Sequence, residues 1–199
     1  MPTTTLTIRF ARLITDVLSP AVLVATLTLV VAWHSATSTA QALAGGLVAA
    51  AAGSIIPITY ILRGVRQGRW TDHHVGVREQ RKLPILICVL STAAGAAVLA
   101  TIGAPRQLIA LVVAMVAALL IAWPVTLWAR WKISIHALVA AGTTTALSVT
   151  FGPLALVTAP AAAAVCWSRV VLRDHTLGQV VAGGAAGTAA MALLFPCLL

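Results

Sequence analysis

Polar side chains capable of phosphate chemistry gather at residues 167–179, between two long apolar runs. Ser168 and Arg169 are adjacent, His175 follows after a spacer of five residues, and Gln179 lies four residues further on. Polar groups at such a junction are costly unless they are solvated or used. The arginine is suited to an oxyanion and the imidazole to nucleophilic attack. The alternative is a solvated loop whose arginines only mark membrane topology.

Two further polar segments, residues 63–82 and residues 130–136, supply groups of the same kind. Arg81 and Arg169 each offer a planar fork of N–H donors that matches phosphate oxygens. Ser134 opens an apolar run, where helix N–H groups and the positive end of the helix dipole favour an anion. A plain N-cap is the alternative role for this serine.

Two histidines lie at the starts of apolar runs, His136 and His175. One imidazole can attack phosphorus while the other protonates the leaving oxygen. Gln179 is one helical turn after His175, so its side-chain oxygen is placed to accept from one ring nitrogen and orient the other. The alternatives are hydrogen-bonded interfacial histidines and a buried polar contact between helices.

The composition identifies an integral membrane protein. Of the 199 residues, 60% are hydrophobic and 9% are charged, and the mean hydropathy is +1.02. A soluble core of this size cannot bury so much apolar surface. The net charge of +9 would suggest nucleic acid in a soluble protein. Here the basic residues lie between apolar runs, so we expect topology signals or contacts with anionic lipids, and no nucleic-acid partner.

The apolar runs predict an all-α transmembrane bundle of about six to seven spans, forming a single domain over residues 1–199. A span needs about 20 apolar residues. The expected spans lie near 13–33, 43–63, 84–102, 107–129, 136–151, 153–171 and 178–198. Gly152-Pro153 is the break between the fifth and the sixth, because this pair rarely continues a helix.

Two spans separate the first polar segment from the second, and two separate the second from the third. An even number of crossings returns the chain to one side, so all three segments are expected on the same face. Twelve of the 13 basic residues lie on that face and only Arg106 lies on the other. The positive-inside rule then predicts a multi-pass plasma-membrane protein whose site faces the cytoplasm.

These residues resemble the type 2 phosphatidic acid phosphatase superfamily of membrane lipid-phosphate phosphatases. Its third motif, Ser-Arg, five residues, His, three residues, Asp, is similar to the segment from Ser168 to Gln179. Its second motif, Pro-Ser-Gly-His, is similar to residues 133–136. Its first, Lys, six residues, Arg-Pro, is similar to the segment from His74 to Lys82. The resemblance covers roughly residues 70 to 190.

The resemblance implies a phosphatase that hydrolyses a lipid phosphate or prenyl diphosphate and needs no metal or other cofactor. It implies that His175 forms a phosphohistidine and that His136 protonates the leaving group. The implied phosphate-binding residues are Arg81, Ser134, Arg169, His74, Lys132 and Ser168. His74 stands where the family has lysine, and Lys132 would replace the charge of that lysine. Gln179 stands at the family's aspartate, so it can orient His175 but cannot stabilise an imidazolium by charge.

Other functions stay open at this level. Gln179 and the two isoleucines of the second motif, Ile133 and Ile135, also suit a catalytically impaired protein that binds lipid phosphate or acts as a scaffold. A membrane prenyltransferase is disfavoured because the four acidic residues are not paired, and a transporter is disfavoured because the polar groups gather at one interface. Asp72, His73, His74 and Glu79 have the spacing of no common metal site. The sequence determines neither the lipid nor the oligomeric state.

Overall fold

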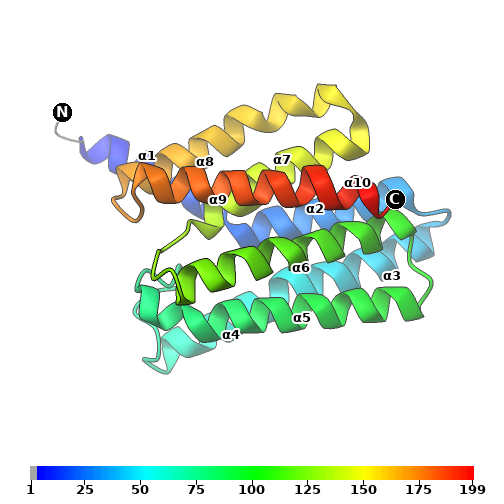
Figure 1. The fold of residues 1–199 in the computed structure, drawn as a ribbon, viewed down its shortest axis with the longest axis horizontal. Coiled ribbons are helices and arrows are strands. Elements are labelled where there is room, and N and C mark those ends of the chain that lie inside the picture. Colours follow the sequence, from blue (N-terminus) through cyan, green and yellow to red (C-terminus); the bar gives the residue numbers. More distant parts are fainter. Residues whose placement is uncertain (1–3) are drawn as a thin grey trace.

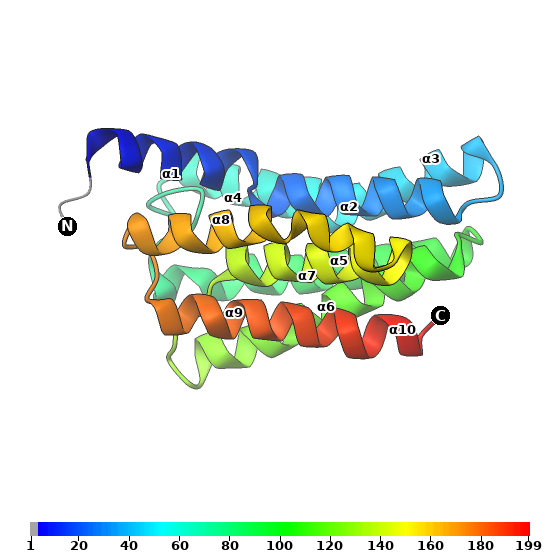
Figure 2. The ribbon, with the colours of Figure 1, turned by 90° about the horizontal axis from the view of Figure 1, so that it is seen from above.

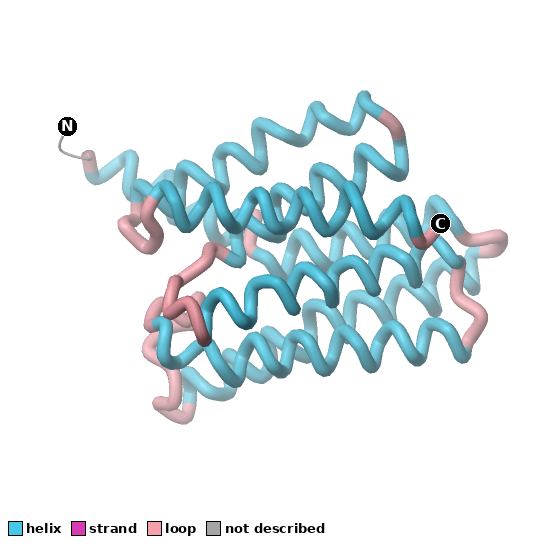
Figure 3. Tube along the Cα trace, in the orientation of Figure 1, coloured by secondary structure: helices cyan, strands magenta, loops and turns pink. Residues whose placement is uncertain are grey.

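The computed structural model describes residues 4–199, and every regular element in that range is a helix (Figures 1 and 3). The helices lie side by side along the long axis of the molecule (Figure 2), which confirms the expected helical bundle. In chain order they are α1 (Thr5–Val17), α2 (Pro20–Ser35), α3 (Thr39–Ala50), η1 (Ala51–Ile55), α4 (Ile56–Arg66), η2 (Arg78–Arg81), α5 (Lys82–Thr101), α6 (Arg106–Leu127), α7 (Ile135–Phe151), η3 (Pro153–Thr158), α8 (Ala159–Val171), α9 (Leu177–Ala189), η4 (Ala190–Leu194) and α10 (Phe195–Cys197).

Within the described chain, 5 helical segments are long and apolar enough to cross a membrane, or up to 6 if α1 and α2 count as one bent span. The shorter α7, with 17 residues, is also apolar. Large apolar side chains face outward, as at Leu154 and Val157, which are 89% and 80% exposed. Outward-facing apolar side chains on apolar helices of this length identify a membrane protein.

The expected single span over 13–33 is wrong in one respect, because α1 and α2 meet at an angle of 41°. Ser19 has extended backbone and Pro20 is the first residue of α2. A proline has no N–H to donate to the preceding turn and disfavours helical backbone in the residue before it, so the helix ends there and a new one begins. The expected break between the fifth and sixth spans is confirmed, since Gly152 has φ +83° and is followed by Pro153.

Two prolines inside long apolar segments lie directly after π-helical turns. η1 ends at Ile55, two residues before Pro57, and η4 ends at Leu194, two residues before Pro196. A proline ring clashes with the carbonyl four residues earlier in a regular α-helix, and its missing N–H breaks the ladder. A wider π turn moves that carbonyl aside, so each segment continues through its proline.

Helices α7 and α9 approach so closely that only glycine fits at two positions. A Cβ on Gly183 would lie 2.4 Å from the carbonyl oxygen of Ser134, and one on Gly187 would lie 2.0 Å from that of Leu138. The close contact of α7 with α9 therefore depends on these two glycines. At Gly184 a Cβ would meet only Ala141, at an ordinary 3.8 Å. Close backbone contact fixes α9 against the first turn of α7, where His136 lies.

The three polar segments lie at one end of the bundle. The connections from α4 to α5, α6 to α7 and α8 to α9 all lie at that end, together with the start of α1 (Figures 1 and 3). The opposite end carries the α2–α3, α5–α6 and α7–α8 connections. This is the arrangement that the even number of crossings predicts.

Candidate active site

Arg81 connects two of the polar segments at the start of α5. Its guanidinium is 5% exposed, with Nε donating to the carbonyl of Val75 at 2.8 Å and Nη1 to that of Ile133 at 3.0 Å. Nη2 lies 3.5 Å from Nε2 of His175, which brings in the third segment. Ile133, one of the two residues that depart from the second motif, therefore acts through its backbone in holding the arginine.

Each of the three loops contains a non-glycine residue with left-handed backbone. These residues are Val75 with φ +49°, Arg130 with φ +50° and Arg173 with φ +58°. Left-handed backbone is uncommon outside glycine and is an outlier for a β-branched valine, so it persists only where the surroundings impose it. At Val75 the surroundings include the Arg81 bond to its carbonyl and burial of its side chain. Strain of this kind is typical of functional sites.

The hydrogen bonds of His175 determine which ring nitrogen carries the proton. Nδ1 lies 3.1 Å from the carbonyl oxygen of Lys132 and 3.2 Å from Oε1 of Gln179. Gln179 Oε1 also accepts from the backbone N–H of Thr176 at 3.2 Å, so the amide oxygen rather than the NH₂ faces this side. With two acceptors beside it, Nδ1 must be the donor, and Nε2 keeps the lone pair. The unprotonated Nε2 therefore faces the Arg81 guanidinium.

The surroundings of His175 keep its imidazole neutral. Burial lowers the pKa of His175 to about 3, and the positive charges of Arg81, Lys132 and Arg169 act in the same direction, while the bond to Gln179 opposes them. The same loops affect Lys132, because burial and the charge of Arg81 lower the pKa of its amine. Its Nζ donates to the carbonyl of Asp174 at 2.7 Å, which holds the loop that carries His175. A neutral imidazole is the form that attacks phosphorus.

Arg169 is 1% exposed, and its donors are only partly used. Nη2 forms an ion pair with Asp174 at 2.8 Å, whereas Nε and Nη1 have no hydrogen-bond partner among the described residues. Nε2 of His136, a residue 6% exposed, is also without a partner in that part of the chain. Leaving buried polar groups of this kind unpaired costs about 1–3 kcal/mol each, and more where they are charged. The arrangement therefore suits an anion that accepts from Arg169.

Ser134 and Ser168 both make structural hydrogen bonds, and for Ser134 the structure confirms the alternative role of an N-cap. The buried hydroxyl of Ser134 caps α7 by accepting from the N–H of Ala137 at 3.3 Å. That of Ser168 donates to Val165 at 2.7 Å and lies 2.9 Å from Thr15 of α1, so it joins α8 to α1 and makes no contact with the other candidates.

His74 lies beside His136, with ring centroids 5.1 Å apart, and its Nε2 is 3.3 Å from Asp16. Burial and the charges of His73 and Arg169 lower the pKa of His74, against the opposing effect of Asp16. The side chain expected to contact phosphate therefore lies against the carboxylate of Asp16.

An apolar cavity of about 530 Å³ extends from this end into the bundle between α2, α4, α5, α6 and α7. Its volume falls within the range of roughly 300–1,000 Å³ that is typical of small-molecule sites. Its polar lining includes His74, Arg81 and His136, and its apolar walls reach Met115 and Met191. Arg169 and His175 do not line it, whereas Arg81 lines the cavity and also lies against His175.

Two acidic residues of the site were missed in the sequence. Asp174 pairs with Arg169 across a spacing of five residues, which matches no helical period, so only the loop geometry brings them together. Asp16 lies 58 positions before His74, and nothing in its neighbourhood indicated that α1 would end at the cavity.

Comparison with protein-family models, with curated proteins and with solved structures finds no match. The chemistry must therefore be argued from the site's own geometry.

Proposed function

We propose that this protein is a membrane-embedded phosphatase that hydrolyses a lipid phosphate or a prenyl diphosphate through a phosphohistidine intermediate at His175. The observation that supports it most is the buried Arg169 guanidinium, whose Nε and Nη1 have no partner among residues 4–199, close to a neutral His175 whose Nε2 lone pair faces Arg81. A phosphoryl group among these side chains would receive the unused hydrogen bonds and balance the excess positive charge. The motif resemblance to the type 2 phosphatidic acid phosphatases supports the same reaction.

The proposed reaction has two displacements. In the first, Nε2 of His175 forms a bond to phosphorus while the bond from phosphorus to the lipid oxygen breaks, and protonated His136 gives that oxygen its proton. In the second, His136 takes a proton from water, the water oxygen attacks phosphorus, and the P–N bond breaks to release inorganic phosphate. Arg81 and Arg169 would stabilise the charge on the transferring group in both steps.

The apolar cavity supports a lipid as the substrate. A hydrocarbon chain in the cavity would leave the phosphoryl group at its polar end, beside Arg81 and His136. We infer from the basic residues at this end that the site faces the cytoplasm across the plasma membrane. Substrates made inside the cell therefore suit it: phosphatidate, phosphatidylglycerophosphate, a prenyl diphosphate or a polyprenyl-linked sugar phosphate.

Phosphate release from these four lipids by the purified protein, with and without a chelator, tests the proposal. We expect release from at least one lipid in the presence of chelator, an acid-labile phosphoprotein on rapid quenching, and loss of both in His175→Ala. His34→Ala, on an exposed histidine of α2 at the other end of the bundle, is the matched control. Unchanged release in folded His175→Ala would refute the enzyme and favour a protein that only binds lipid phosphate.

A further inference from the structure

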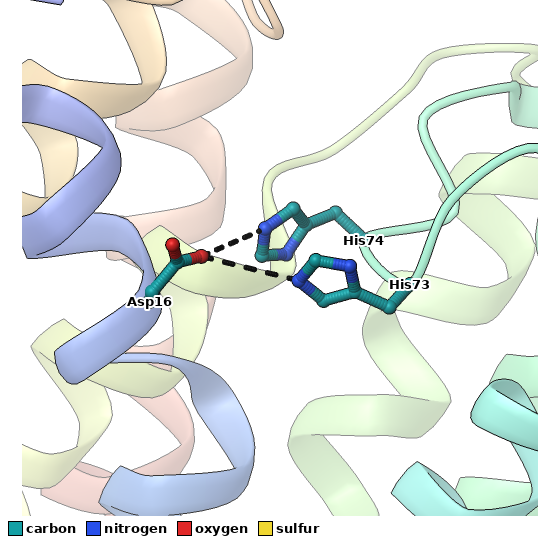
Figure 4. Close-up of side chains that lie close together, drawn as sticks. All are labelled: Asp16, His73 and His74. Carbon is teal, nitrogen blue, oxygen red and sulfur yellow. Dashed lines mark ion pairs between the residues drawn. The ribbon is translucent and has the colours of Figure 1, made fainter. Parts of the chain in front are cut away.

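Three metal-ligating side chains meet at the mouth of the cavity, outside the phosphate-binding cluster. Asp16 comes from the last turn of α1, and His73 and His74 come from the loop between α4 and α5 (Figure 4). Oδ1 of Asp16 lies 3.3 Å from Nε2 of His74 and 3.9 Å from Nε2 of His73. One ligand atom from each residue lies within 4.8 Å of the others, and all three residues line the cavity.

The two segments are held in place by bonds that leave the three ligand atoms available. The carboxylate of Asp72 accepts from the N–H groups of His74 at 2.7 Å and Gly76 at 3.1 Å, and these bonds fix the loop. Thr15, next to Asp16, is buried and hydrogen-bonded to Ser168 of α8. The position of the trio is therefore set by tertiary structure, although Asp16 and His73 are exposed.

The electrostatics at Asp16 favour a cation. A carboxylate in the last turn of a helix faces the negative end of the helix dipole, which is unfavourable. Its described partners are two imidazoles, which are cationic only when protonated. A metal ion bound here would stabilise the carboxylate without requiring either histidine to carry a proton.

The ligand set is that of a divalent transition-metal ion. Two imidazoles and one carboxylate bind Zn²⁺ in many catalytic sites, with bonds of about 2.0–2.2 Å. In tetrahedral geometry such bonds place the ligand atoms about 3.4 Å apart. The 3.3 Å separation already matches this value, and the 3.9 Å separation requires a shift of about half an ångström by the His73 ring.

We propose that Asp16, His73 and His74 form a binding site for a divalent transition-metal ion such as Zn²⁺ at the mouth of the cavity. The ion would join α1 to the α4–α5 loop and keep at least one coordination position for water or an anion. The site does not depend on the proposed phosphatase chemistry, which uses a different set of side chains. Sequence spacing could not join Asp16 to His73 and His74, because this carboxylate lies far from the two histidines along the chain.

Zinc binding by the purified full-length protein tests the proposal. After chelator treatment and dialysis, titration calorimetry with ZnCl₂ should show one site per chain. His73→Ala, His74→Ala and Asp16→Asn should each weaken binding at least about tenfold, because each removes a ligand. Asp72→Ala should weaken it about 10–100-fold through the loop, as is typical of groups that orient ligands. The matched control His34→Ala should bind like the unmodified protein.

Cobalt absorption separates this site from zinc bound by the three cysteines. Co²⁺ in the site should give the visible bands of tetrahedral nitrogen and oxygen ligation without the near-ultraviolet band of thiolate. Stoichiometric binding that survives in both His74→Ala and Asp16→Asn, or a thiolate band, would overturn the proposal. So would the absence of binding to folded protein at millimolar Zn²⁺. Phosphate release that persists in zinc-deficient Asp16→Asn and His73→Ala would leave the phosphatase proposal intact.

Discussion

Replacing Gln179 by glutamate changes the charge beside His175 while keeping the length of the side chain. In the structure Oε1 of Gln179 is 3.2 Å from Nδ1 of His175. Two unit charges about 4 Å apart at an effective dielectric constant of about 20 interact by about 4 kcal/mol, which corresponds to about 3 pKa units. Because the pKa of His175 is about 3 in this environment, Gln179→Glu should raise it to about 6.

The acid limb of the pH profile measures this shift. If neutral His175 attacks phosphorus, kcat/KM should decrease at pH values below the pKa of His175 in the free enzyme. The limb should therefore move from strongly acidic pH in the unmodified protein to about pH 6 in Gln179→Glu. Gln179→Asp, with a side chain one methylene shorter, should show a smaller shift and keep or raise activity at neutral pH.

Gln179→Met separates the effect of a charge at position 179 from the effect of the hydrogen bond to His175. Methionine has a similar length and no acceptor oxygen, while the Lys132 carbonyl still accepts from Nδ1. We expect a modest loss of rate and an acid limb that moves to lower pH, because the bond to Gln179 raises the pKa of His175. An acid limb that is identical in folded Gln179→Glu and in the unmodified protein would refute the assignment of His175 as the attacking base.

Three further expectations follow from the contacts of single residues. Arg81→Lys should lower turnover about 100-fold or more, because a compact ammonium lacks the planar fork that directs separate nitrogens to the Val75 and Ile133 carbonyls; unchanged steady-state kinetics would show that the fork is unimportant. Gly187→Ala should lower the unfolding temperature in detergent strongly, while Gly184→Ala should be tolerated; equal effects would contradict the packing. As pH falls from 6.5 to 3, the free energy of unfolding should fall by about 1.4 kcal/mol per pH unit because of His175, since its unfolded form binds a proton that its folded form does not bind; the slope should be smaller by about this amount in His175→Gln.

The helices and their shared polar end were predictable because they depend on local composition. Apolar runs give the spans, and an even number of crossings places three loops at one end. The bend at Ser19-Pro20 was missed because a proline near the start of an apolar run is equally compatible with one tilted span and with two helices. Tertiary packing of α1 against α8 decides between them, and the hydroxyls of Thr15 and Ser168 form part of that contact.

The contact between the side-chain oxygen of Gln179 and a ring nitrogen of His175 was predicted, but the reason given for it was incomplete. The expected cause was one turn of helix, but α9 begins only at Leu177, after His175. Thr176 is the N-cap, and its side chain and that of Gln179 form a capping box. The sequence Thr-Leu-Gly-Gln carries that signal, because a threonine followed three residues later by glutamine marks a helix start. Gln179 thus closes the helix end and orients the histidine with one oxygen.

The buried charges of the site are only partly paired within the described residues. Arg81 and Arg169 are both buried, and Asp174 is the only carboxylate among the described residues that forms an ion pair with either of them. A buried guanidinium that keeps unpaired donors destabilises the fold, so a sequence selected for stability alone would replace it with an apolar side chain. Three strained loops and a closely packed glycine face hold these charges in place instead. Such an arrangement is expected where the missing hydrogen-bond acceptors belong to a ligand, and a phosphoryl group has the charge and the oxygens to supply them.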